Sequence, residues 1–124
     1  MSLPNAKAYI YCLLCCDESI YTGVAVDLEK RMRVHFKGGA AAAAYTRAHG
    51  ARHLLLAFVA PSLSAALRGE ARIKRLSRKE KEALIADPAA HSDALFSPIG
   101  EGPFIPLLPT DNEIKRINQT VFCV

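Results

Sequence analysis

A helix predicted over residues 62–76 carries one carboxylate where apolar side chains are expected to pack. Glu70 lies one helical turn from Ala66 and Leu67 and one turn before Ile73. Because burial of an unpaired carboxylate is costly, Glu70 must meet a cation of the protein, bind a metal ion or line a cleft. A structural ion pair with an arginine is the alternative to a functional site.

A second predicted helix, residues 28–36, places Arg31 and His35 four residues apart on one face. An arginine can hold a phosphate group with two donors, and a histidine one turn away can hold or relay a proton. Arginine and histidine are also common on helix surfaces, so the pair indicates a phosphate site only together with other features.

Three tyrosines lie in predicted strands. Tyr9 and Tyr11 share one face of the first strand because side chains alternate, and Tyr21 belongs to the second strand. Tyrosines in strands usually serve packing. A phenol, with an ordinary pKa of about 10, acts as a base only when a metal ion or a cationic side chain lowers that pKa.

The charge of the chain favours a polyanionic partner, with nucleic acid first. The 16 Lys and Arg and 12 Asp and Glu give +4, and residues 1–87 carry a net +6 against −2 for residues 88–124. A basic stripe at helical spacing suits phosphates, although an ordinary solvated face has the same pattern. The stripe consists of Arg68, Arg72, Arg75 and Lys79. Lys30, beside Arg31, and Arg47, in a basic loop, are further candidate contacts.

Hydrophobic periodicity predicts a mixed α+β fold in the order β-β-α-β-α-α. The polar Asp17-Glu18 break predicts a hairpin between the first two strands. In the first helix Leu28, Met32 and Phe36 are expected to form the buried stripe. The expected strands are residues 9–16, 19–26 and 53–60, and the expected helices are residues 28–36, 62–76 and 77–87.

The chain after residue 87 has a different composition. Five of the seven prolines fall in residues 88–124 and predict mostly extended or irregular chain. A short terminal helix is expected to follow, with Ile114, Ile117 and Val121 on its apolar face. We therefore expect a domain over residues 1–87 and a Pro-rich C-terminal extension over residues 88–124, which docks on the domain or forms a homodimer.

The cellular setting is predicted from composition. No stretch approaches the ~18 apolar residues of a membrane span, and the first residues lack a signal-peptide pattern, so we expect a cytoplasmic protein without a membrane partner. Three of the four cysteines, Cys12, Cys15 and Cys16, share one apolar run, which favours reduced thiols over a disulfide framework.

The order and spacing of the candidate residues resemble the GIY-YIG nuclease domain. The naming motifs correspond to Tyr9-Ile10-Tyr11 and Tyr21-Thr22-Gly23. Arg31 follows the second motif's tyrosine by ten residues, and His35 follows Arg31 by four. The resemblance covers about residues 8–87 and is strongest to small stand-alone bacterial members, relatives of the nuclease half of the excision-repair incision protein. It implies a three-stranded antiparallel sheet flanked by helices and suggests a role in DNA repair.

The resemblance also implies a role for each matching residue. Glu70 resembles the family's single metal-binding carboxylate, which holds Mg²⁺ or Mn²⁺ together with waters and substrate phosphate. Arg31 resembles the arginine that stabilises charge on the scissile phosphate. Tyr11 and Tyr21 match the tyrosines that position and activate the attacking water, and His35 supports this network. The group that takes the proton stays open.

The activity implied by the resemblance is a divalent-metal-dependent endonuclease. It would hydrolyse phosphodiester bonds of DNA, single-stranded or branched, and leave 3′-hydroxyl and 5′-phosphate ends, with RNA not distinguished from DNA. The alternatives are a nucleic-acid-binding module with little catalysis and a subunit that needs a partner to choose its substrate. Departures from the family pattern are Tyr9 in place of a glycine, Val24 in place of a lysine, and no counterpart of an asparagine that follows the glutamate.

Overall fold

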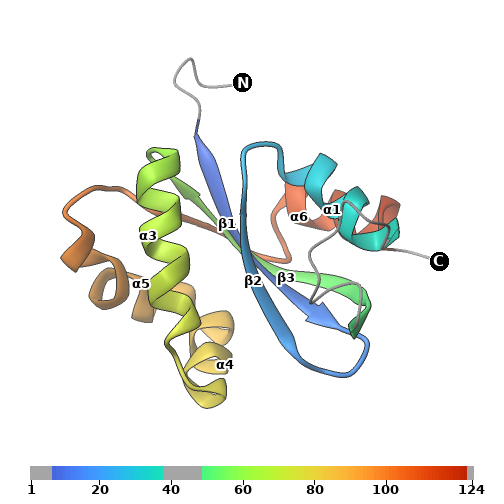
Figure 1. Cartoon of the computed structure of the whole chain (residues 1–124), viewed down its shortest axis with the longest axis horizontal. Coiled ribbons are helices and arrows are strands. Elements are labelled where there is room, and N and C mark those ends of the chain that lie inside the picture. The colour runs from blue at the N-terminus through green and yellow to red at the C-terminus, as the bar shows by residue number, and fades with distance from the viewer. Residues whose placement is uncertain (1–6, 38–48, 123–124) are drawn as a thin grey trace.

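The computed structural model describes residues 7–37 and 49–122, which form one antiparallel four-stranded sheet between two layers of helices (Figure 1). The strand order is β2-β1-β3-β4, with one strand more than expected. The strands are β1 (Ala8–Cys15), β2 (Ile20–Ala25), β3 (Ala51–Ala60) and β4 (Ile105–Leu107). The helices are α1 (Leu28–Lys37), α3 (Leu63–Lys74), α4 (Arg78–Ala86), α5 (Pro88–Phe96), the 3₁₀ turn η1 (Ser97–Ile99) and α6 (Asn112–Thr120). The predicted α+β class and antiparallel sheet are confirmed.

The central strand β1 is buried on both faces, as its almost continuous apolar sequence requires. Ile10 and Cys12 point into the core that α3, α4 and α5 cover. Tyr11 and Leu13 point into the opposite core, which α1 and α6 cover. Alternation along one strand therefore sends the motif tyrosine to the side of α1 (Figure 1).

The starts of α3 and α4 follow from their capping residues. The Ser62 hydroxyl accepts a hydrogen bond from the Ala65 N–H at 3.0 Å. Ser77 and Glu80 form a reciprocal capping box at the start of α4. Both predicted helices are thus confirmed, and the cap at Ser62 fixes where the helix that bears Glu70 begins.

The prediction of mostly irregular chain after residue 87 is wrong. The carboxylate of Asp87 accepts a hydrogen bond from the Ala90 N–H, and Pro88 occupies the first turn of α5, where a missing N–H costs nothing. The same two residues had indicated only the end of α4. Helix α5 then buries Phe96 in the core beneath α3.

The terminal helix α6 is confirmed, and it docks on the sheet of its own chain. Ile114 and Ile117 are fully buried beside Leu54. The Asn118 side-chain amide donates to the Leu54 carbonyl at 2.9 Å and accepts from the Leu54 N–H at 2.8 Å. The extension thus supplies β4 and core residues on both faces of the sheet, while the homodimer through it stays a prediction.

The apolar stripe of α1 differs from the expected one. Leu28, Met32 and His35 are buried, whereas Phe36 is 39% exposed. Seven residues complete nearly two helical turns, so His35 faces the sheet as Leu28 does, and Phe36 is rotated toward α6. Its ring makes an edge contact with Phe122, with centroids 5.8 Å apart.

The described cysteines Cys12, Cys15 and Cys16 are free thiols, as predicted. Among the helices of the described ranges, none has the length and apolar character that crossing a membrane requires.

Candidate functional site

Two aromatic rings and an imidazole form the centre of the candidate site. The Tyr11 hydroxyl lies 2.6 Å from His35 Nε2, so the two groups share a short buried hydrogen bond. The centroid of the Tyr21 ring lies 5.5 Å from the centroid of the imidazole and 6.2 Å from that of the Tyr11 ring. The hairpin brings the tyrosines together, and α1 places the imidazole of His35 beside both rings.

Gly23 makes this close packing possible. A Cβ atom at Gly23 would lie 2.4 Å from the Tyr11 hydroxyl oxygen and 2.6 Å from its Cζ, far inside van der Waals contact. It would also lie 3.0 Å from Cε2 of Tyr21. Position 23 pairs with Tyr11 across β1 and β2, so the glycine of the second motif is needed for space beside the first motif's tyrosine.

Burial dominates the electrostatics of Tyr11. Desolvation raises the pKa of its hydroxyl well above 10, and the charges of Tyr21 and Glu70 raise the pKa further. Arg31 opposes this through a hydrogen bond and its positive charge, without overcoming burial. The phenol is therefore protonated at neutral pH, with Arg31 in contact and Glu70 within electrostatic reach.

His35 is neutral at the same pH. Burial and, second, the nearby Arg31 charge lower its pKa from 6.5 to about 4. A neutral imidazole has one nitrogen that can accept, and the protonated Tyr11 hydroxyl has one proton to donate. The Tyr11 hydroxyl can therefore donate to Nε2 in the tautomer that carries the imidazole proton on Nδ1.

Helix α3 brings Glu70 to the site because Gly69 lets the helix approach β1 closely. A Cβ at Gly69 would lie 2.5 Å from Cδ1 of Ile10, the neighbour of Tyr11 in β1. The rings of Phe96 and Phe104, which are stacked with centroids 4.3 Å apart, lie 3.2 and 3.3 Å from the same Cβ position. The extension thus packs against the helix at the residue before the candidate metal ligand.

The surroundings of Glu70 fit a metal ion that keeps most of its water. Its side chain is 19% exposed and pairs with Lys74 of the next turn at 3.5 Å. In residues 7–37 and 49–122, no three His, Cys, Asp or Glu side chains gather closely enough to form a full protein ligand set. One accessible carboxylate suits Mg²⁺, which dehydrates reluctantly, better than a cation that needs a protein cage.

The structure places Tyr11, Tyr21, His35 and Arg31 close together, has Glu70 within electrostatic reach of Tyr11, and leaves most of the basic stripe elsewhere. The Arg68 guanidinium pairs with Glu101 of the extension, and Arg72 Nε donates to the Leu95 carbonyl. Both cations therefore hold the extension against α3, a contact that helical spacing could not reveal. Arg75 and Lys79 are exposed, Lys30 lies on the outer side of α1, and Arg47 lies outside the described residues. Nucleic-acid binding by all of these residues stays a prediction.

Tyr9, which replaces the first motif's glycine, has a role that the sequence did not indicate. Its ring packs against the core cluster to which α6 contributes Ile114 and Ile117, with Glu113 of the same helix nearby. Burial, followed by the charges of Glu113 and Asp27, raises the pKa of this tyrosine. The departure from the motif therefore places an aromatic ring against the core that α6 completes.

The fold and the site together define a small mixed α+β protein with a candidate centre for phosphodiester chemistry. The family model described as the GIY-YIG catalytic domain matches residues 7–83, more than half of the chain, and the chain belongs to this family of nuclease domains. Membership supports the nuclease class.

Among curated relatives, the UPF0213 protein YhbQ of Escherichia coli O8 (strain IAI1) is 38% identical over 91 residues, covering 72% of this chain and 87% of its own. A UPF0213 protein of Syntrophus aciditrophicus is 41% identical over 80 residues, with 64% and 91% covered. The solution NMR structure of the UPF0213 protein BH0048 from Bacillus halodurans is 40% identical, with 64% and 83% covered and a TM-score of 0.42. None of these names states an activity.

Proposed function

We propose that this protein is a divalent-metal-dependent endonuclease that hydrolyses phosphodiester bonds of single-stranded or branched DNA and leaves 3′-hydroxyl and 5′-phosphate ends. The observation that carries the proposal is the hydrogen bond of 2.6 Å between Tyr11 and His35, with the charge of Arg31 acting on the same hydroxyl. Hydrolysis needs a water that loses a proton and a cation beside the phosphate, and these residues supply both functions.

The proton of the attacking water has a direct route. A water beside the Tyr11 hydroxyl transfers its proton to the phenol oxygen, while the phenol passes its own proton to Nε2 of His35. The phenol stays neutral throughout, which agrees with the raised pKa of Tyr11. His35 is thus the proton acceptor, and Tyr11 connects it to the water; Tyr21 lines the same space and orients the water.

Arg31 couples phosphate binding to the basicity of His35. Its charge is one of the two causes that lower the pKa of the imidazole in the free protein. When a scissile phosphate pairs with the guanidinium, that charge is offset and the pKa of His35 rises. The base therefore gains strength when the substrate is in place.

Glu70 would hold the divalent cation, which when bound supplies positive charge to the phosphate and lowers the pKa of bound water. Its place on α3, within electrostatic reach of Tyr11, supports this assignment. Lys74, paired with Glu70 at 3.5 Å, helps to orient the carboxylate at the site.

The test is cleavage of end-labelled DNA substrates by the full chain. Single-stranded, duplex, flap and splayed-arm DNA and an RNA strand are incubated with Mg²⁺, Mn²⁺ or EDTA. We expect cutting only with a divalent cation, 5′-phosphate ends that ligase accepts, and loss of cutting in Glu70→Gln. Glu82→Gln, an exposed carboxylate of α4 paired with Arg78, is the matched control and is expected to cut normally.

The outcomes separate the proposal from its alternatives. Equal cutting by Glu70→Gln and the unchanged protein would contradict the proposal. Salt-sensitive DNA binding without cutting would favour a binding module of the same fold. Cutting only after addition of cell extract would favour a subunit that needs a partner.

A further inference from the structure

A groove between α1 and α6 has the composition of a binding site that the catalytic centre does not use. It encloses about 390 Å³ and is lined by Phe36, Val34 and Val121 together with the cations Lys30, Arg33 and Lys37. No acidic side chain of the described ranges lines it. We call it the α1–α6 groove. An apolar floor with three cations on one side fits an anionic ligand that also has a flat apolar part.

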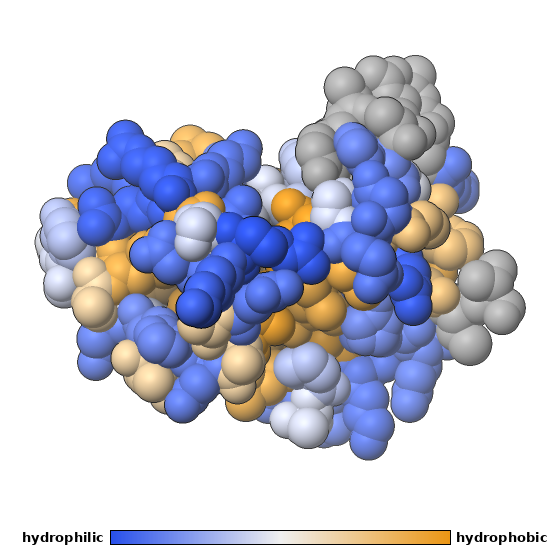
Figure 2. Space-filling view, turned by 90° about the horizontal axis from the view of Figure 1, so that it is seen from below, coloured by the Kyte–Doolittle hydropathy of each residue, from blue (hydrophilic) through white to orange (hydrophobic). Residues whose placement is uncertain are grey.

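Phe36 is the unusual member of the groove. Its ring is 39% exposed, although it belongs to a helix with other residues fully buried. The edge contact with Phe122, at an interplanar angle of 78°, holds the ring in place. Figure 2, which shows the molecule from below, shows that hydrophobic residues reach the surface among hydrophilic ones on that face as well.

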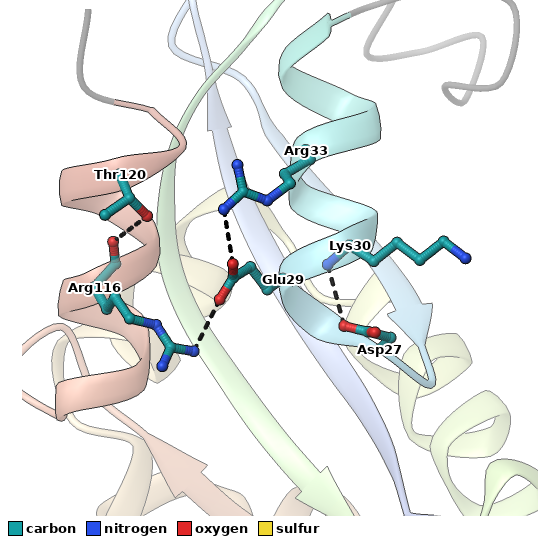
Figure 3. A network of polar contacts seen from close by, with 6 residues as sticks. All are labelled: Asp27, Glu29, Lys30, Arg33, Arg116 and Thr120. Carbon is teal, nitrogen blue, oxygen red and sulfur yellow. Dashed lines mark hydrogen bonds and ion pairs between the residues drawn. The ribbon is translucent and has the colours of Figure 1, made fainter.

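Arg33, one of the three cations that line the groove, is paired with a carboxylate that is not part of the groove lining. Glu29 bridges Arg33 and Arg116, with both N···O distances 2.8 Å, and this bridge lies between α1 and α6 (Figure 3). One carboxylate thus neutralises one of two guanidinium charges and fixes both. The Lys30 side chain extends away from this network.

The groove lies across α1 from the catalytic residues. Because successive residues turn by about 100° around a helix, Lys30 and Lys37 stand between Arg31 and Phe36 on the outer surface of α1. The helix with its side chains is roughly 10 Å wide. A nucleic-acid strand that crosses its outer surface from Arg31 therefore meets two ammonium groups before it reaches the ring of Phe36. Exposed aromatic rings that stack bases, beside cations that contact phosphates, are how proteins hold single strands.

We propose that the α1–α6 groove binds a single-stranded nucleic acid, with one unpaired base stacked on Phe36 and its flanking phosphates on Lys30 and Lys37, a few nucleotides from the phosphate held by Arg31. The inference rests on the proposed function for the direction in which the strand continues. Duplex DNA does not fit, since its bases are already stacked within the helix. The groove therefore selects single-stranded or branched substrates.

The absence of tryptophan from the chain allows a direct test. Phe36→Trp creates a single-tryptophan protein, which is titrated with a 12-nucleotide oligothymidine in EDTA so that cleavage plays no part. We expect quenching of the tryptophan emission by the oligothymidine, and none by an oligonucleotide of the same length with abasic sites. Binding of the oligothymidine and of the abasic oligonucleotide is also measured by the fluorescence anisotropy of a labelled strand. If Phe36→Trp still binds both, the variant is folded.

Substitutions separate stacking from charge. Phe36→Leu keeps the apolar bulk and is expected to bind oligothymidine at least about fivefold more weakly, with unchanged binding of the abasic strand and rescue by Phe36→Tyr. Lys30→Gln and Lys37→Gln are each expected to reduce the salt dependence of binding to both strands by about 0.7 in log–log slope. The matched controls are Leu67→Ala, an exposed apolar residue of α3, and Lys115→Gln, an exposed lysine of α6 outside the groove.

Three results would overturn the proposal. These are emission unaffected by the oligothymidine, equal weakening in Phe36→Leu and Leu67→Ala, and a change of oligomeric state in Phe36→Leu, which would assign the groove to a second copy of the chain. The proposed function fails separately. If the protein binds as described but never cuts, the groove is a strand-binding site without a nuclease, and if it cuts normally in Phe36→Leu, only the groove assignment is lost.

Discussion

Replacement of His35 by glutamine tests whether the buried imidazole is neutral. His35 is 1% exposed, and its pKa is about 4 in the folded chain, against 6.5 as its ordinary value. Between these values the unfolded chain binds a proton that the folded chain does not, so the stability of the protein falls as the pH falls from about 6.5 to about 4 and is unaffected by this group above 6.5. Glutamine does not titrate and keeps an oxygen that can accept from Tyr11.

The magnitude follows from the two pKa values. The difference between 6.5 and about 4 corresponds to about 3 kcal/mol of unfolding free energy, of which about 2 kcal/mol is lost by pH 5. Urea unfolding at pH 7 and at pH 5 measures this loss of unfolding free energy. The unchanged protein is expected to lose about 2 kcal/mol more than His35→Gln over this interval, because all other titrating groups are common to both.

The control for this measurement is His91→Gln, which removes an exposed histidine of α5. It is expected to follow the unchanged protein at both pH values. Parallel losses in His35→Gln and the unchanged protein would refute the assignment of a neutral imidazole, and with it the proposal that His35 accepts a proton through Tyr11.

Three further substitutions probe the close packing of the site. Gly23→Ala is expected to displace the Tyr11 phenol by about 1 Å, which costs about 1–3 kcal/mol of unfolding free energy in urea and slows cleavage about 100-fold. In the control Gly102→Ala no atom lies within 4 Å of the added Cβ, so unfolding free energy and cleavage rate are expected to stay unchanged. Gly69→Ala is expected to push α3 from β1 and raise the Mn²⁺ concentration needed for half-maximal cleavage, since overpacking of about 1–3 kcal/mol exceeds the about 1 kcal/mol gained in helix propensity. Tyr9→Phe keeps the ring that packs against the core and is expected to change unfolding free energy by no more than about 0.5 kcal/mol, with cleavage retained.

Much of the fold could be predicted from local pattern. The hairpin, α1, β3, α3 and α4 each combine a clear apolar period with a cap or a turn signal, as in the Ser77 capping box. The extension could not be predicted in this way. Asp87 and Pro88 are equally good signals for the end of one helix and the start of the next, and β4 is three residues long with a proline at its centre. These elements form because the β3 edge and the α3 surface are there to receive them.

The candidate site was predictable as a set of residues and not as an arrangement. The residue types, their spacing and the resemblance identified Tyr11, Arg31 and Glu70, but the neutral state of His35 depends on how deeply it is buried, which spacing does not give. Charge pattern likewise did not distinguish Arg68, which pairs with the extension, from cations that face solvent.

The short strand β4 also keeps the edge of the sheet from pairing with strands of other chains. β3 is ten residues long and largely apolar, and an exposed edge of this kind offers unpaired N–H and C=O groups to other chains. β4 covers the edge at Ala57–Val59, and its central Pro106, opposite Phe58, lacks the N–H with which another strand could be joined. The proline-rich composition that looked like an unstructured tail thus ends the sheet, and a chain that lacked it would be prone to self-association.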